Sequence, residues 1–177
     1  MKRKSSHWVK RAALLGCSCL ALDFISISQA LAGAIIWQHD SGQVHYWFMQ
    51  NGNRIAAIDI SSPVGSAWHL KGVGDVTGNG TADIVWQHDS GQVHYWLMQN
   101  GNRVVGIDIG APVSGDWQLK AVGDVTSDGT TDIVWQHNSG QVHYWQIWNG
   151  NYVAGIDIGT PVGSDWHLRG VGDINGE

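Results

Sequence analysis

Residues 86–96 read WQHDSGQVHYW, and the same stretch occurs at 37–47 and, with Asn138 in place of an aspartate, at 135–145. The spacing is 49 residues in both intervals, from Trp37 to Trp86 and from Trp86 to Trp135. Aligning 37–85 with 86–134 leaves 35 identical positions out of 49. A period of this length predicts a repeat architecture with structurally equivalent copies.

Turn signals divide each repeat into four short apolar stretches. In the second unit these predict strands at Trp68–Val73, Asp83–Gln87, Gln92–Met98 and Arg103–Ile109. Asn100-Gly101 lies between the last two, and this dipeptide favours a type I′ hairpin turn. With 24 glycines and three prolines in 177 residues, helices are not expected. Four antiparallel strands in this length predict an all-β fold of β-propeller blades.

The number of units is small for a propeller. We expect units at about 35–73, 74–122 and 123–171, followed by a truncated loop at 173–177. They contribute twelve strands, from Ile35 to a last strand at 166–171. The first unit has no opening strand in this count, because the place of that strand in the repeat falls at residues 19–24. Closed propellers have about four to eight blades. Three blades therefore predict an incomplete propeller that self-associates through open blade edges, or a fragment of a longer protein.

The N-terminal segment has the pattern of a secretory signal peptide at residues 1–32. Five basic residues within 1–11 precede the apolar run 12–22 and the small-residue site Ala30-Leu31-Ala32. The protein is then secreted or lies at the cell surface. An uncleaved segment, or lipidation at Cys17, would instead attach it to a membrane. Both cysteines, Cys17 and Cys19, lie in this segment, so the mature chain has no disulfide.

Charge excludes one class of partner. Residues 33–177 contain five basic and fourteen acidic residues, a net charge of 5 − 14 = −9. Binding to phosphate backbones needs clustered lysine and arginine, so nucleic acid is not an expected partner. Thirteen of the fourteen acids are aspartates, which favour turns and serve as ligands of hard cations.

Two aspartate-rich loops follow the calcium-loop pattern at positions 1, 3, 5 and 9, with glycine at position 6 and a backbone carbonyl available at position 7. Their members are Asp75, Thr77, Asn79, Thr81 and Asp83 in the first loop and Asp124, Thr126, Asp128, Thr130 and Asp132 in the second. An EF-hand is excluded, because Trp86 and Trp135 stand where its bidentate glutamate would be. The alternative is a turn without an ion. We expect Ca²⁺, bound more tightly at the second loop because that loop has three carboxylates.

These residues resemble the FG-GAP or VCBS-type repeat of bacterial exported proteins, which is related to the integrin α-subunit propeller. Its pattern is carried by Val73-Gly74-Asp75, the loop through Gly80, Asp83-Ile84-Val85 and Gly91-Gln92-Val93, with the equivalent set from Val122 to Val142. Trp86-Gln87-His88 stands where the family has Gly-Ala-Pro. The resemblance implies a Ca²⁺-supported β-propeller that serves adhesion or ligand binding, with a protein or a glycan as its partner.

Aromatic and histidine side chains recur with the repeat. Tryptophans at equivalent places predict packing between blades, and sugar stacking, as in a propeller lectin, is the alternative. Trp148 and Tyr152 break the repeat beside the Asn149-Gly150 turn, so an exposed pair there is the first ligand-binding candidate. The paired histidines of each hairpin lack a third metal ligand. No asymmetric set of catalytic groups is present, so an enzyme is not expected, although the chain could be a non-catalytic part of a larger secreted enzyme.

Overall fold

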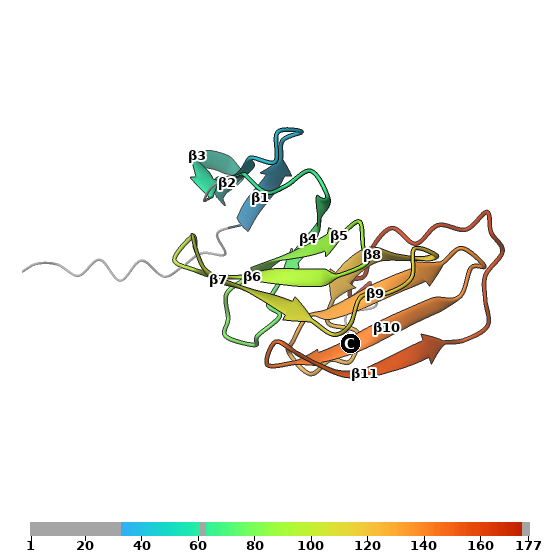
Figure 1. Cartoon of the computed structure of the whole chain (residues 1–177). Coiled ribbons are helices and arrows are strands. Elements are labelled where there is room, and N and C mark those ends of the chain that lie inside the picture. Colours follow the sequence, from blue (N-terminus) through green and yellow to red (C-terminus); the bar gives the residue numbers. More distant parts are fainter. Residues whose placement is uncertain (1–32, 61–62, 175–177) are drawn as a thin grey trace, which may run out of the picture. The chain divides into compact units, whose positions relative to one another are not determined.

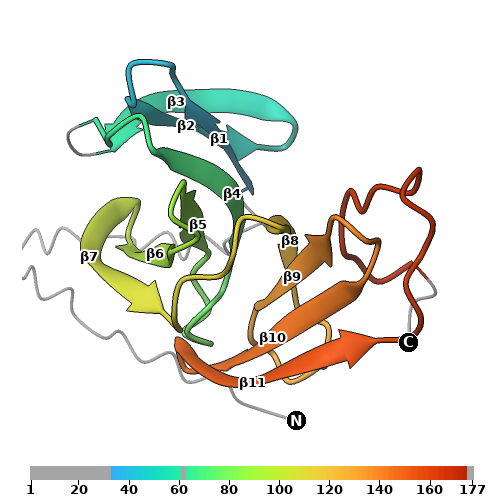
Figure 2. The same cartoon turned by 45° about the vertical axis from the view of Figure 1, so that its right-hand side comes forward.

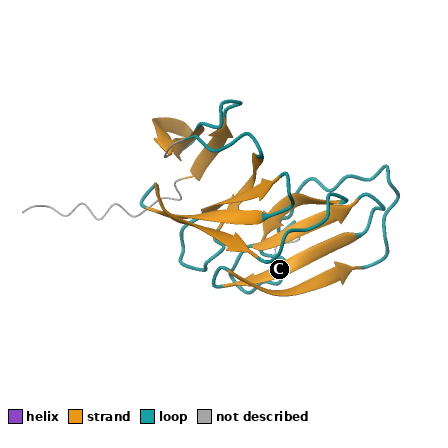
Figure 3. Ribbon diagram, viewed as in Figure 1, coloured by secondary structure: helices purple, strands orange, loops and turns teal. Residues whose placement is uncertain are grey.

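The computed structural model describes residues 33–60 and 63–174 and contains strands and loops without any helix in these ranges (Figures 1 and 3). The predicted signal peptide, 1–32, lies outside the described residues. The described strands number eleven and belong to three separate sheets. The all-β prediction is therefore confirmed.

Every pair of neighbouring strands is antiparallel, and each sheet follows the order of the chain. Sheet A contains β1 (Gly33–Gln38), β2 (Val44–Gln50) and β3 (Asn53–Ile60). Sheet B contains β4 (Trp68–Gly74), β5 (Asp83–His88), β6 (Val93–Gln99) and β7 (Asn102–Ile109). Sheet C contains β8 (Trp117–Gly123), β9 (Asp132–His137), β10 (Val142–Trp148) and β11 (Asn151–Ile158). No sheet closes into a barrel.

Turn chemistry sets the hairpins at the predicted places. The strands of sheet B begin and end within one residue of the sequence prediction. Asn100 and Gly101 have φ values of 50° and 77°, the two left-handed conformations that a type I′ turn requires. Asn51-Gly52 and Asn149-Gly150 repeat this geometry in the other two sheets. The predicted hairpin turn is confirmed in all three copies.

The predicted last strand is not formed. Residues 166–171 have the sequence of an opening strand but no strand conformation. In sheets B and C the opening strand pairs with the next strand of the same sheet, β4 with β5 and β8 with β9. The equivalent partner of 166–171 would lie one repeat further on, beyond Glu177. The sequence pattern therefore predicts eleven of the twelve strands correctly. The twelfth is not formed because a strand also needs a neighbouring strand with which to pair.

Two hydrophobic clusters hold the three sheets together. One joins sheets A and B and is centred on Trp86, and the other joins sheets B and C and is centred on Trp135. Both tryptophans are 1% exposed. Strands β5 and β9 are buried along most of their length, as their unbroken apolar sequences predict. The repeat thus packs each sheet against the next with equivalent side chains.

The backbones of sheets B and C approach each other most closely where β4 and β8 lie side by side (Figure 2). A side chain added at Gly72 would overlap Val122, and one added at Gly74 would overlap Thr131. The backbone N–H of Thr131 donates to the carbonyl of Asp75 at 2.8 Å. Glycine at these positions permits the close approach of the two backbones.

Candidate functional site

The two aspartate-rich loops occupy equivalent places in the fold. Residues 75–82 connect β4 to β5, and residues 124–131 connect β8 to β9. Gly80 and Gly129, at loop position 6, have φ values of 84° and 87°. Position 4 is also left-handed in both loops, with φ of 73° at Gly78 and 59° at Ser127. The glycines at position 6 therefore make the sharp turn that the sequence pattern predicts there.

The first aspartate of each loop organises the backbone around it. Asp75 Oδ1 accepts a hydrogen bond from the N–H of Asn79 at 3.0 Å, and its Oδ2 accepts one from Gly80 at 2.7 Å. Asp124 accepts the same two bonds, from Asp128 at 3.1 Å and from Gly129 at 2.9 Å. Both loops thus fold around a carboxylate at position 1, as expected for charge-assisted bonds.

The last aspartate of each loop is fully buried. Asp83 Oδ1 accepts from the N–H of Met98, and Asp132 Oδ1 accepts from Ile147, each at 2.9 Å. Burial raises the pKa of both carboxyls, while these hydrogen bonds act against the rise. The charge of Asp75 raises the pKa of Asp83 further. Nearby positive charge would therefore stabilise the ionised carboxylates.

The intermediate positions differ between the loops. Asn79 Oδ1 accepts from the N–H of Thr81 at 2.8 Å, and Thr77 Oγ1 lies 3.5 Å from Asp83 Oδ2. In the second loop Asp128 Oδ1 lies 2.5 Å from Thr130 Oγ1, and the hydrogen bond from this hydroxyl lowers the pKa of Asp128. Asp128 is the additional carboxylate that led us to expect tighter binding there.

The remaining contacts of the second loop tie it to sheet C. Asp132 Oδ2 accepts from the N–H groups of Val125 and Thr126 and from the hydroxyl of Thr126 at 3.0–3.2 Å. Thr130 Oγ1 lies 2.6 Å from the carbonyl oxygen of Ile147 on β10. The loop is therefore built into the sheet and does not project freely from it.

The donor chemistry of these loops fits a hard cation. Carboxylate, amide, hydroxyl and carbonyl oxygens are the ligands that Ca²⁺ takes. The ion pairs in the described part of the chain join histidines to Asp59, Asp89, Asp108 and Asp157, so no loop aspartate is among them. In the same residues no three His, Cys, Asp or Glu side chains form a metal-binding group. A cation in either loop would therefore need the neutral oxygens as well as the aspartates.

Trp148 and Tyr152 are both exposed, at 49% and 44%, but the structure does not bring them together. The ring of Tyr152 lies edge-on against Trp145, with centroids 5.1 Å apart. In sheet B the equivalent Arg103 lies over the ring of Trp96 at 4.5 Å. Tyr152 thus covers a core tryptophan as the arginine does, and it does not form a clamp with Trp148.

The repeated tryptophans mainly fill the core. Trp86 packs against Trp96 with ring centroids 4.8 Å apart, and Trp135 packs against Trp145 at 4.9 Å. The indole N–H groups of Trp86 and Trp135 are buried and have no hydrogen-bond acceptor among the described residues. All four rings are at most 7% exposed, which agrees with the packing interpretation.

The histidines of each hairpin are engaged separately. His94 Nδ1 lies 2.7 Å from Asp108 Oδ1, while His88 Nδ1 lies 2.8 Å from the hydroxyl oxygen of Ser90. The ring of Trp68 lies against both, at 4.8 Å from His88 and 5.3 Å from His94. These contacts occupy one ring nitrogen and one ring face of each histidine.

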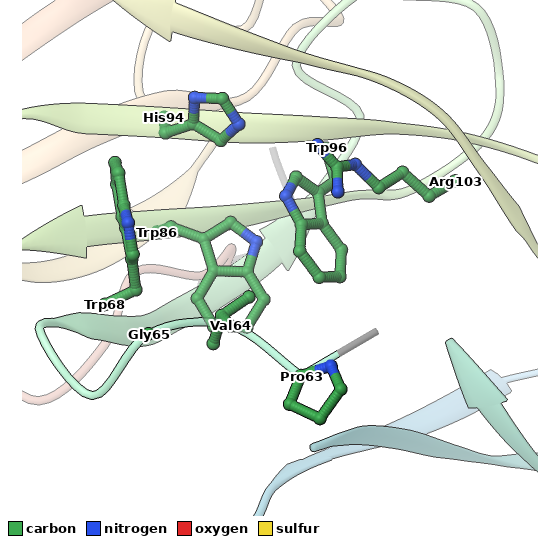
Figure 4. Close-up of a pocket in the computed structure, with 8 residues that line it drawn as sticks. All are labelled: Pro63, Val64, Gly65, Trp68, Trp86, His94, Trp96 and Arg103. Atoms are coloured by element: carbon green, nitrogen blue, oxygen red, sulfur yellow. The ribbon is translucent and has the colours of Figure 1, made fainter. Parts of the chain in front are cut away.

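One cavity of about 420 Å³ was not predicted from the sequence (Figure 4). It lies between the segment 63–65 and the tryptophans of sheet B, and His94 and Arg103 also line it. One sequence signal for this cavity was available, which is the Pro-Val pair that recurs in each repeat and stands at 63–64 beside the cavity. Carbon-rich walls with two nitrogen-bearing side chains could hold a small polar ligand.

Comparison with known proteins adds no assignment. No protein-family model matches the chain, and no curated protein matches it. No helix that is long and apolar enough to cross a membrane occurs in residues 33–60 and 63–174. The resemblance to the FG-GAP or VCBS-type repeat therefore stays a prediction, and functional inference rests on the residues themselves.

Proposed function

We propose that the chain is an exported, calcium-stabilised repeat module of the FG-GAP or VCBS type, which binds a protein or glycan ligand at a surface. Its three sheets are blades of a β-propeller in this proposal. The observation that carries it is the pair of equivalent loops, 75–83 and 124–132, each folded around the carboxylate at position 1 with a buried carboxylate at position 9. Catalysis is not part of the proposal.

Asp75, Asn79 and Asp83 would hold the cation in the first loop, and Asp124, Asp128 and Asp132 would hold it in the second. Bound Ca²⁺ supplies positive charge that offsets the repulsion between Asp75 and Asp83 and the burial of Asp83. The threonine hydroxyls and the carbonyls at position 7 add neutral oxygens. The aspartates thereby remain ionised inside the fold.

The first loop also forms part of the contact between sheets. The carbonyl of Asp75 accepts from Thr131, and the carbonyl of Val76 accepts from Gly150 at 3.0 Å. Val76 itself is fully buried in the cluster that joins sheets B and C. A cation that fixes this loop would therefore stabilise the packing of one sheet on the next as well as the loop itself.

Thermal unfolding in Ca²⁺ and in EGTA tests the proposal. At a calcium concentration about 100 times Kd, each site adds about 2.7 kcal/mol to the free energy of unfolding. We expect Tm to rise by about 5–15 °C between excess EGTA and 10 mM Ca²⁺. Asp124→Asn should reduce the rise by about half, because it removes a carboxylate from one of two loops.

The matched control is Asp165→Asn, which removes a carboxylate from an exposed turn outside both loops. It should leave the calcium-dependent rise unchanged. An identical Tm in EGTA and in Ca²⁺ would overturn the calcium proposal. A rise that persists in full in Asp124→Asn would place the ion elsewhere.

A further inference from the structure

Sheet A lacks one strand that the other two sheets have. In sheets B and C the second strand pairs on both sides, β5 with β4 and β6, and β9 with β8 and β10. The equivalent strand of sheet A, β1, pairs with β2 alone among the described strands. No described strand pairs with its other edge, which is where an opening strand would pair.

The segment 166–172 has the sequence of the missing strand. It reads WHLRGVG, against WHLKGVG in β4 and WQLKAVG in β8. The segment is not in strand conformation, but it lies beside sheet C as an opening strand would. Among the described residues, sheet A thus has no opening strand, and the segment 166–172 has the sequence of an opening strand but no pairing strand.

Hydrogen bonds place this segment in the same way as the true opening strand β4. Gln136 Nε2 donates to the carbonyl of Trp166 at 2.7 Å, and the N–H of Leu168 donates to Gln136 Oε1 at 3.0 Å. Two repeats earlier, Gln38 makes the same pair of bonds to residues 68 and 70, at 2.6 and 2.9 Å. The anchoring is therefore repeated although the pairing strand is absent.

Glycine contacts agree with this placement. A side chain added at Gly123 would press against Val171, as one added at Gly72 would press against Val122. Val171 thus lies against β8, as its repeat equivalent Val122 lies against β4, although the two contacts fall at different positions of the strands, because the equivalent of Gly123 is Gly74. Residues 166–172 are thus anchored to sheet C as β4 is anchored to sheet A.

The side chains that such a sheet would cover are exposed. Trp166 is 73% exposed, whereas the equivalent Trp68 lies against two histidines. On the other side of the missing contact, Trp37 is 46% exposed, whereas the equivalent Trp86 is buried. Ile158 on sheet C is 40% exposed, while its equivalent Ile60 on sheet A is 3% exposed. Both end surfaces repeat, residue for residue, the two sides of an internal interface.

The contacts between tyrosine hydroxyls and turn glycines show the same missing neighbour. The hydroxyl of Tyr46 packs on Gly101 of the next sheet, and that of Tyr95 packs on Gly150. In the repeat, Tyr144 of sheet C is next in this series, and Gly52 is the corresponding turn glycine of sheet A. No atom lies within 4 Å of a side chain built at Gly52. The turn of sheet A therefore has room for a tyrosine hydroxyl that no described residue supplies.

We propose that residues 166–172 of one chain add to the free edge of β1 in a second copy of the chain, completing a four-stranded sheet. Pairing of β8 with β9 gives the register, which sets Trp166 opposite His39, Leu168 opposite Trp37 and Val171 opposite Ile35. Two copies that exchange this strand form a head-to-tail dimer of six sheets.

The choice of a second copy rests on the proposed propeller arrangement. Pairing within one chain would close a ring of three sheets, below the about four blades of the smallest usual propeller. A dimer has six sheets, which is within the usual range. The occupant is thus another chain with the same sequence, because each chain presents both halves of the contact.

Cysteine cross-linking between chains tests the register. Ile35→Cys and Val171→Cys are made separately, with different affinity tags, in the full chain with Cys17 and Cys19 replaced by serine. After mixing, partial unfolding and refolding together, and oxidation, we expect a disulfide-linked heterodimer. Val162→Cys replaces Val171→Cys in the control, because Val162 is similarly exposed but out of register, and its cross-linking should be at least tenfold weaker.

The unmodified chain provides a second measurement. Light scattering after gel filtration should give twice the mass of one chain, and Val171→Asp should halve it while Val162→Asp should not. A monomeric unmodified chain, or a cross-link found only within a chain carrying both Ile35→Cys and Val171→Cys, would overturn the proposal. These results do not depend on calcium. Failure here with a calcium-dependent Tm would leave the proposed function standing.

Discussion

Replacing Trp135 with alanine is expected to lower the free energy of unfolding by about 3–5 kcal/mol, as for other fully buried large aromatic residues. Trp135 is the less exposed of the two tryptophans buried in the cluster between sheets B and C, and it packs on the other, Trp145, at 4.9 Å. The substitution leaves a cavity between two sheets whose backbones are fixed by hydrogen bonds, so little collapse can fill it. Denaturant unfolding measures the loss as a lower midpoint.

Trp148→Ala is the matched control for this substitution. It removes the same side chain from the end of β10, where half of the ring is exposed. We expect a loss below about 1 kcal/mol there. Equal losses for Trp135→Ala and Trp148→Ala would contradict the assignment of Trp135 to an inter-sheet core.

Gly91→Ala is expected to destabilise the protein by at least about 2 kcal/mol, for two separate reasons. Gly91 has a φ of 86°, which strains any residue with a side chain. An added Cβ would also overlap the carbonyl oxygen of Val113, in the segment that joins sheets B and C. The N–H of Val113 donates to the carbonyl of Gly91 at 3.2 Å, so the two backbones cannot separate without losing this bond.

Gly115→Ala tests whether the effect is local. Gly115 lies in the same connecting segment, has no positive φ and has open space where a side chain would stand. Its substitution should change the free energy of unfolding by less than about 0.5 kcal/mol. A loss at Gly115 as large as that at Gly91 would show that the connection tolerates no substitution at all.

Much of the fold could be predicted from the sequence, because the deciding interactions are local and repeated. Asn-Gly sets each tight hairpin through the conformations of two residues. The apolar stretch 84–86 predicts a strand that is buried on both faces, and β5 is such a strand. The spacing of aspartate and glycine in 75–83 predicts a turn, and Gly80 makes it. Three equivalent copies give the same signals at each place.

Features that depend on distant residues could not be predicted in the same way. The segment 166–171 has the pattern of a strand, yet its partner lies outside the described sheets. The sequence predicts Trp148 and Tyr152 as an exposed pair, and both are exposed, but Tyr152 lies against Trp145, where the equivalent Arg103 lies over Trp96 in sheet B. The cavity beside Trp68 depends on how the connection from sheet A returns, which residue types alone do not specify.

Both proposals follow from one property of the chain, which is that each repeat is completed by its neighbour. The loop at 75–83 contacts the next sheet through Thr131 and Gly150. The segment 166–172 has the sequence of an opening strand, but it pairs with no strand among the described residues. Calcium would stabilise the contacts within a chain, and strand addition would supply the contact between chains.

The number of calcium ions bound per chain tests the central claim most directly. Calorimetric titration of the purified protein, first stripped with EGTA, should give about two ions per chain, with Kd values of about 10⁻⁴ to 10⁻³ M and the tighter site at 124–132. Asp124→Asn should abolish or weaken that site and leave the site at 75–83 intact. Absence of any calcium binding at 10 mM, in a chain that is folded by circular dichroism, would contradict the account.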